Sequence, residues 1–159
     1  MIFRSDTSGI DKLLARVRKA QTELPRVTVN AAQRAGDTVK GQLASAAPKG
    51  QSGGMPPPGD SPGPLSGSFS AKAEQRGIGA HMELKTSQPF KLKLVTGGRK
   101  AVVPVTKKAL MWKGLPHPVM RSGPVKANDF VTPVMNRRAN AVKAEMQKAI
   151  QEIRSILGG

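Results

Sequence analysis

The amino-acid sequence predicts an α+β fold with N-terminal helices, a Pro/Gly-rich arm, a small antiparallel β-sheet and a long C-terminal helix packed on it. Apolar residues follow a helical period near both ends of the chain, and short alternating segments occupy its middle. Helices and strands are therefore segregated along the chain, as α+β proteins have them. The length of 159 residues suits a single domain. We divide it into N-terminal helices (1–47), a flexible arm (48–66), a β meander with an extended loop (67–127) and a C-terminal helix (128–159).

Two helices are expected at the N-terminus. The first has apolar residues at three- and four-residue steps: Ile10, Leu13, Leu14, Val17 and Leu24. Ser8 suits its cap, and the helix should end before Pro25, which in turn suits the first turn of a second helix reaching Ala47. That second helix has a narrow stripe of mostly small residues: Ala32, Ala35, Val39, Leu43 and Ala46. We interpret both stripes as core or subunit packing, not as a ligand site.

The arm that follows is too rich in Gly, Pro and Ser for regular structure. These three residue types account for 17 of the 23 residues from Pro48 to Ser70. Repeated prolines exclude a helix or a central strand and leave an irregular or polyproline-like loop. Two interpretations stay open: a flexible linker, or an arm that becomes ordered on a neighbouring protein. Met55 and Leu65 are its candidate interaction residues.

The middle of the chain should form a β meander. Four short segments are expected as strands: Ser66–Arg76, Ile78–Thr86, Phe90–Thr96 and Ala101–Val105. Apolar residues and lysines alternate in the third segment, as a half-buried antiparallel strand requires. Gly97-Gly98 predicts a hairpin turn between the third and fourth segments.

The last segment has the strongest helical pattern. Its apolar residues are Val142, Met146, Ile150, Ile153 and Leu157. Thr132 followed by Pro133 suits an N-cap and a first helical position, although Asn128-Asp129 could instead begin a short preceding turn. Gly158-Gly159 should end the helix.

The chain carries 26 basic and 10 acidic residues, a net charge of +16. Ten of the basic residues and no acidic ones fall between Leu84 and Asn128. Such a surface attracts polyanions or an acidic protein and opposes self-association. Lys107, Lys108 and Trp112, in the middle of this stretch, are interaction candidates, and Trp112 is interpreted as an anchor in the core in preference to a platform for base stacking. Without a nucleic-acid-binding motif, the charge fits nonspecific polyanion contact or docking to an acidic protein.

The sequence offers little for catalysis. It contains no Cys, and its two histidines, His81 and His117, lack the neighbouring ligands of a metal site. No nucleophile elbow or phosphate-binding loop is present. We therefore expect no enzymatic activity, no cofactor and no metal. No apolar run is long enough to span a bilayer, and the first residues lack the core of a signal peptide. We expect a soluble protein made in the cytoplasm, with no membrane partner.

Three short motifs, in order, resemble those of a known family. Pro64–Phe69 (PLSGSF) is similar to the family's start of the first strand, and Val103–Trp112 (VPVTKKALMW) to its later strand and turn. Asn128–Met135 (NDFVTPVM), which contains Phe130, is similar to the start of its closing helix. The chain thus resembles the HK97 gp10-like group of phage tail-completion and head–tail joining proteins, also called neck or minor tail proteins.

This resemblance implies a structural protein of the virion tail or neck. It would assemble as a ring, expected to be a hexamer, that caps the tail and helps join it to the capsid connector. Its partners would be other copies of itself, the tail-tube or terminator protein and the head-connector protein, and Phe130 would be an interaction candidate. The alternative is a nonspecific basic nucleic-acid-binding protein that contacts DNA.

Overall fold

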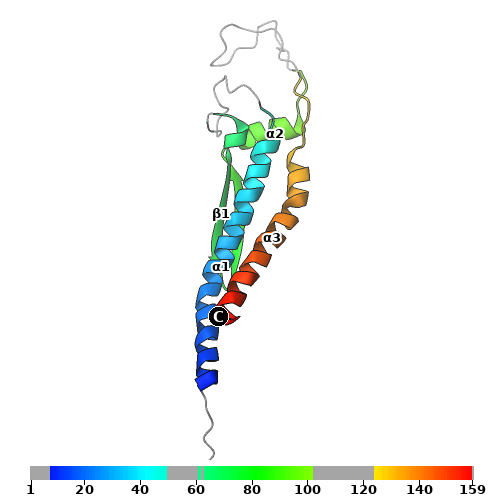
Figure 1. Cartoon of the computed structure of the whole chain (residues 1–159). Coiled ribbons are helices and arrows are strands. Elements are labelled where there is room, and N and C mark those ends of the chain that lie inside the picture. Colours follow the sequence, from blue (N-terminus) through cyan, green and yellow to red (C-terminus); the bar gives the residue numbers. More distant parts are fainter. Residues whose placement is uncertain (1–7, 50–60, 62, 102–123, 159) are drawn as a thin grey trace, which may run out of the picture. The chain divides into compact units, whose positions relative to one another are not determined.

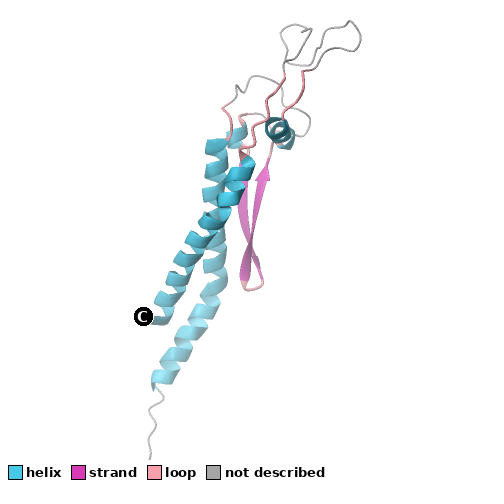
Figure 2. Cartoon of the chain, turned by 90° about the vertical axis from the view of Figure 1, so that its right-hand side faces the viewer, coloured by secondary structure: helices cyan, strands magenta, loops and turns pink. Residues whose placement is uncertain are grey.

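The computed structural model describes residues 8–49, 61, 63–101 and 124–158, and its elements confirm the α+β class (Figure 1). They comprise α1 (Ser8–Ala46), a 3-10 turn (Leu65–Gly67), β1 (Phe69–Arg76), β2 (Gly79–Thr86), α2 (Pro89–Gly97) and α3 (Val131–Gly158). The two strands form one antiparallel hairpin, shown in magenta in Figure 2. None of the helices in the described ranges is long and apolar enough to cross a membrane.

The chain divides into two compact units, each made of separate stretches. Unit 1 contains Met1–Thr38, Ala71–Glu83 and Arg138–Gly159. Unit 2 contains Val39–Ser70 and Leu84–Arg137. Both long helices and both strands contribute residues to each unit.

In unit 1, α1 and α3 run antiparallel and pack through small side chains. Val27 and Ala31 of α1 form a buried cluster with Ala149 of α3, and Ile153 packs against it. Two ion pairs mark the register of the helices, because Arg34 lies 2.7 Å from Glu145 and Arg26 lies 4.0 Å from Glu152. Small residues at the contact let the two helix backbones approach closely.

The hairpin of unit 1 is attached to α1 by one amide side chain. Gln33 Nε2 donates to the carbonyl oxygen of Ala71 at 3.2 Å, and Gln33 Oε1 accepts from the backbone N–H of Ala73 at 2.9 Å. The side chain therefore satisfies backbone groups at the edge of β1, where a third strand would otherwise pair. Gly77 turns the hairpin with φ +59°, which suits the first central residue of a two-residue turn.

Unit 2 has its own apolar core. Its buried apolar side chains are Val39, Leu43, Ala47, Leu65, Phe69, Phe130 and Val134. The rings of Phe69 and Phe130 meet edge to face, with centroids 6.3 Å apart and planes at 72°. Buried Ser68 donates from Oγ to the Leu65 carbonyl at 2.7 Å, which fixes the turn before β1. Two of the motifs that carry the family resemblance therefore meet here, through Phe69 and Phe130.

The predicted break between two N-terminal helices is wrong. α1 continues through Pro25, which lies inside a helix of 39 residues. A proline removes one helical hydrogen bond and crowds the preceding turn, at a cost of about 3 kcal/mol. Immediately after it, however, Val27 and Ala31 are packed against α3. Tertiary packing of this kind supplies most of the stability of helices in proteins and outweighs a local breaker.

The predicted third strand, Phe90–Thr96, is also wrong, because these residues form α2. Pro89 takes an early helical position and Gly98, with φ +67°, ends the helix. Alternation of apolar and polar residues over about six positions does not distinguish a strand from a short helix. Here Pro89 at the start and Gly98 at the end both favour a helix.

The predicted hairpin at Gly97-Gly98 is absent as well. Arg99 pairs antiparallel with Val125, through two backbone hydrogen bonds of 2.9 Å. A Cβ at Gly98 would lie 2.7 Å from the Val125 carbonyl oxygen, so this close approach requires glycine. Residues 102–105 of the predicted fourth strand lie outside the described residues.

α3 begins at Val131, two residues before the predicted first position at Pro133. Asp129 Oδ1 accepts a hydrogen bond of 3.1 Å from the backbone N–H of Thr132. Hydrogen bonds from Thr132 lower the pKa of the Asp129 carboxyl, as expected for a carboxylate at a helix N-terminus. Asp129, and not Thr132, therefore caps the helix, which ends at Gly158.

Candidate assembly surfaces

The large apolar side chains of α3 lie mostly outside the core of unit 1. Val142, Met146, Ile150 and Leu157 are 37–51% exposed, and we call them the α3 stripe. The positions of α3 that are buried in unit 1 carry Glu145 and Ala149 instead. The stripe predicted from the sequence contained these four residues and Ile153. Of the five, only Ile153 packs against the buried cluster of α1 and α3.

A small apolar hollow adjoins the α3 stripe. Its volume is about 190 Å³, and its lining residues are Thr28, Ala31, Ala32, Ala35, Gly79, Ala80, Met82, Val142 and Met146. Small side chains of α1 and the hairpin leave this space, and two members of the stripe form one wall. An incoming apolar side chain could therefore be inserted between α1 and α3.

In the part of the chain that the structure describes, no helix lies opposite the N-terminal part of α1. The numbers of facing residues in two antiparallel helices have a nearly constant sum. In the two ion pairs between α1 and α3 this sum is about 178, so Gly158 at the end of α3 lies opposite Ala20. Residues 9–19, which we call the α1 overhang, are all exposed. Its large apolar residues are Ile10 (60% exposed), Leu13 (56%), Leu14 (48%) and Val17 (36%). Figure 1 shows this blue end of α1 extending past the red end of α3.

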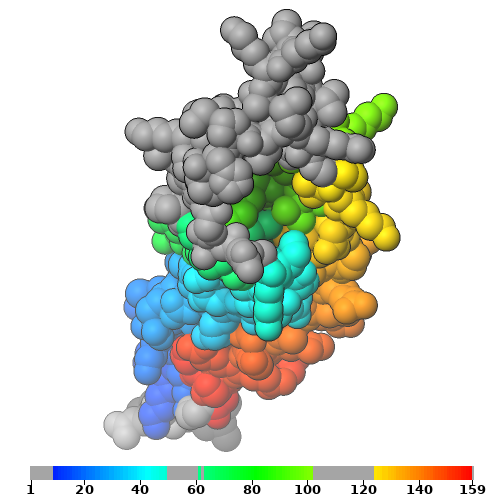
Figure 3. All heavy atoms as spheres, turned by 90° about the horizontal axis from the view of Figure 1, so that it is seen from above, coloured from blue at the N-terminus to red at the C-terminus, as the bar shows by residue number. Residues whose placement is uncertain are grey.

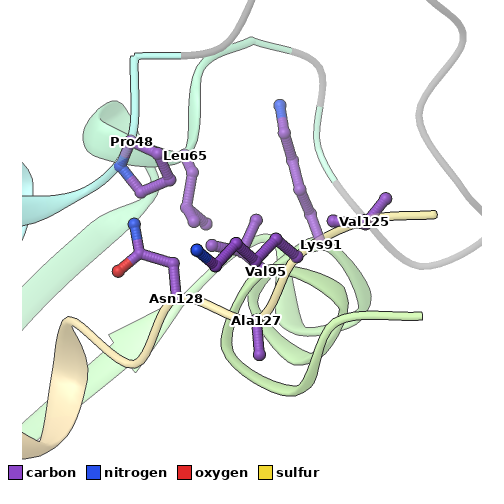
Figure 4. Close-up of a pocket in the computed structure, with 8 residues that line it drawn as sticks. Pro48, Leu65, Lys91, Val95, Val125, Ala127 and Asn128 are labelled. Atoms are coloured by element: carbon purple, nitrogen blue, oxygen red, sulfur yellow. The ribbon is translucent and has the colours of Figure 1, made fainter. Parts of the chain in front are cut away.

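Unit 2 carries a larger pocket of about 610 Å³, shown in Figure 4. Its lining residues are Pro48, Leu65, Lys91, Val95, Val125, Lys126, Ala127 and Asn128. Most of them are apolar. The Lys91 ammonium donates to the Gly63 carbonyl oxygen at 3.0 Å, and Lys126 is exposed. α2 and the residues after Pro124 are held together here, because Asn128 donates its backbone N–H to the Val95 carbonyl at 2.8 Å. Figure 3 shows these two segments, green and yellow, next to each other.

The described part of unit 2 is strongly basic. Its only acidic residue is Asp129. Its basic residues are Lys40, Lys49, Lys85, Lys91, Lys93, Arg99, Lys100, Lys126 and Arg137. The pocket therefore lies on a positively charged unit, suited to a partner that brings an apolar anchor surrounded by carboxylates.

Unit 1 is closer to charge balance. The most buried of its acids, Glu145, accepts from Arg34 Nε at 2.7 Å and from Lys148 Nζ at 2.5 Å. The hydrogen bonds from Lys148 and then Arg34 hold the pKa of Glu145 below its usual range. Six of the eight acidic residues in the described ranges belong to unit 1 outside the α1 overhang: Glu23, Asp37, Glu74, Glu83, Glu145 and Glu152.

The structure describes two of the interaction candidates predicted from the sequence. Leu65 is 2% exposed and lines the pocket of unit 2, and Phe130 is 6% exposed and packs on Phe69. Both belong to the core of that unit. The other candidates, Met55, Lys107, Lys108 and Trp112, lie outside the described residues, as do arm residues 50–60 and 62.

Sequence reasoning did not find the pocket. Its walls come from four separate stretches, around Pro48, Leu65, Lys91 and Val125, which meet only in the folded chain. No periodicity or motif marks them. The α1 overhang, in contrast, was visible as an apolar stripe, but its lack of a partner was not.

Within the ranges that the structure describes, no group of three or more His, Asp or Glu residues is placed to hold a metal ion. The chain was compared with protein families, curated proteins and solved structures, and nothing matches. The surfaces described above are therefore the basis for assigning a function.

Proposed function

We propose that the chain is a structural protein of a tailed-phage virion, a subunit of a ring at the head–tail interface. The ring would cap the tail and help join it to the capsid connector. Three motifs in family order, from Pro64 to Met135, support the choice of this class of protein. The observation that carries the proposal is the exposed α3 stripe, which a second subunit could cover.

The α3 stripe is unusual for a chain that works alone. Single exposed apolar residues are normal on protein surfaces, but a continuous row of them marks an interaction site. Val142, Met146 and Ile150 follow each other at steps of four, so they lie along one side of α3. Burying each of them would contribute part of the ~1.5–3 kcal/mol for a fully buried side chain. A subunit contact on α3 explains why these residues are apolar.

Unit 2 supplies a different surface, suited to another protein. Its nine basic residues against one acid favour an acidic partner, and its pocket offers an apolar site for an anchoring side chain. Charge complementarity would speed association and select the partner. We assign this surface to the docking of the ring on a neighbouring connector or tail protein.

The proposal is tested by complementation of a phage from which this gene has been deleted. Filled heads and separate tails should accumulate, and electron microscopy should show joined particles once the wild-type chain is supplied. Ile150→Asp places a charge in the α3 stripe and should abolish joining. The matched control, Gln151→Asp, adds the same charge at the neighbouring exposed position and should join normally. Joined virions without the protein would contradict the proposal, as would normal joining by a folded Ile150→Asp chain.

A nonspecific nucleic-acid-binding protein is the second candidate, favoured by the charge of unit 2. Its test is duplex binding at several salt concentrations, because affinity from phosphate contacts falls steeply as salt rises. We expect weak binding at ~0.15 M salt. Tight duplex binding at this salt concentration would favour this candidate if replacing both Lys93 and Lys126 by Glu abolished the binding and left phage joining normal.

A further inference from the structure

We infer that the α1 overhang of one copy docks on the α3 stripe of the next copy. This contact rests on the proposed function, because it would be the contact that repeats around the ring. The two surfaces lie at different places on unit 1, so a head-to-tail arrangement covers both in every subunit. A contact between different surfaces closes into a ring when the rotation permits.

The overhang and the stripe are both apolar, and the overhang is short enough to lie within the stripe. Its four large apolar residues lie on one side of the helix over about 11 Å, from Ile10 to Val17. The α3 stripe extends over about 22 Å from Val142 to Leu157. The hollow beside Val142 and Met146 offers a place for one side chain of the incoming helix. Neither surface can cover the other within one chain, since the overhang begins where α3 ends.

Charge favours this arrangement over a symmetric one in which two overhangs pair. The overhang has four basic residues, Lys12, Arg16, Arg18 and Lys19, and one acid, Asp11. Two paired overhangs would bring eight basic side chains together with two carboxylates. The rest of unit 1 holds six of the eight described acids, whereas unit 2 holds one. Unit 1 outside the overhang is therefore the least repulsive part of a second copy.

The contact is too small to hold two copies together stably, so several such contacts would be needed in one assembly. A helix face about 17 Å long and about 10 Å wide is much smaller than the roughly 800 Å² per partner of a stable interface. One overhang would hold two free copies together weakly. Several such contacts in a closed ring, or copies placed side by side on a partner, would reinforce each other.

Disulfide trapping tests the contact, and the chain suits it because it contains no Cys. Leu13→Cys and Ile150→Cys are made as separate proteins, mixed in equal amounts and oxidised with diamide. In one chain these positions lie far beyond the 4.4–6.8 Å between Cα atoms that a disulfide spans, so a bond reports contact between copies. The mixture should yield a crosslinked dimer of the two different variants, identified by mass after one is isotope-labelled. Lys12→Cys, on the opposite side of the overhang, is the matched control and should crosslink with Ile150→Cys at least 5-fold less.

Each result decides between arrangements. Crosslinking of Leu13→Cys with itself at a higher yield than with Ile150→Cys would show paired overhangs and overturn the inference. No crosslink at any pair, or equal yields for Leu13→Cys and Lys12→Cys, would overturn it too. The complementation assay is read in parallel. If deletion of the gene leaves joining intact, the proposed function fails; if joining needs the chain but the crosslink is absent, only the inference fails.

Discussion

Gly36 of α1 lies against Met82 of β2 so closely that a Cβ added at Gly36 would be 2.9 Å from the Met82 Sδ. The same Cβ would be 3.0 Å from the Cβ of Ala71 in β1. The hairpin of unit 1 therefore rests on a helix surface that only glycine leaves free. A glycine inside a helix costs roughly 1 kcal/mol relative to alanine, and here the close packing of the hairpin offsets that cost.

Gly36→Ala should consequently destabilise the protein, although alanine is the better helix former. Overpacking costs typically ~1–3 kcal/mol, and the gain in helix propensity returns up to ~1 kcal/mol. Gly41→Ala is the matched control, because nothing lies within 4 Å of a Cβ at Gly41 of the same helix. Chemical unfolding followed by circular dichroism should show a lower midpoint for Gly36→Ala and an equal or higher one for Gly41→Ala. If Gly36→Ala were as stable as Gly41→Ala, the hairpin would not pack where the structure has it.

The sequence predicted the fold where long-range periodicity and turn residues agreed, and it failed where local signals conflicted with packing. β1, β2 and α3 follow from alternation, the turn at Gly77 and a long apolar period. α1 could not be predicted as one helix, because Pro25 is a strong local breaker and the packing that overrides it comes from α3, more than 100 residues further on. α2 failed because the alternation of apolar and lysine residues fits a strand as well as one face of a short helix.

Pro25→Ala follows as a direct prediction. Alanine would restore the backbone N–H that proline lacks, and the helix is already formed around this position. We expect the thermal midpoint of the free protein to rise, by an amount that corresponds to ~1–3 kcal/mol. Circular dichroism at 222 nm during heating measures it. A fall in the midpoint would mean that the direction of α1 set by Pro25 is itself needed for packing.

Glu145 should make the stability of unit 1 sensitive to acid. Lys148 and Arg34 hold the pKa of its carboxyl below the usual range, so the folded state binds a proton less readily than the unfolded state. The stabilisation is therefore fully present above the ordinary glutamate pKa of about 4.3 and is lost as the pH falls through the lower folded pKa. Glu145→Gln should lower the denaturant midpoint at pH 7, with the difference from wild type shrinking below about pH 4.

Glu74→Gln is the control for this substitution. Glu74 pairs with Lys72 at 2.7 Å, but both side chains are at least 60% exposed. Water and salt weaken such exposed pairs, so the change at pH 7 should be small. Equal effects of the two substitutions would show that the contact of Glu145 with α1 contributes nothing beyond a surface pair.

The candidate surfaces were only partly predictable, for a related reason. Helical periodicity located Ile10–Val17 and Val142–Leu157, but a stripe looks the same in sequence whether its partner lies in its own chain or in another copy. Only the register of α1 against α3 separates the two cases. Leu65 was expected to make contacts as part of the arm and Phe130 as part of a motif, but both are buried in the unit 2 core.

Salt should strengthen self-association of the free protein. Each chain carries +16, so copies repel one another at long range, while the overhang contact that would join them is small and apolar. Raising the salt from ~0.05 to ~0.5 M shortens the Debye length from about 14 to about 4 Å and removes most of that repulsion. Light scattering should therefore give a higher mean mass at high salt, and Leu13→Asp should keep the mass of the monomer in both conditions. Lys12→Asp, on the other side of the overhang, lowers the charge and should associate at least as well as wild type. A single stable oligomer at both salt concentrations, unchanged by Leu13→Asp, would show that another surface holds the subunits together.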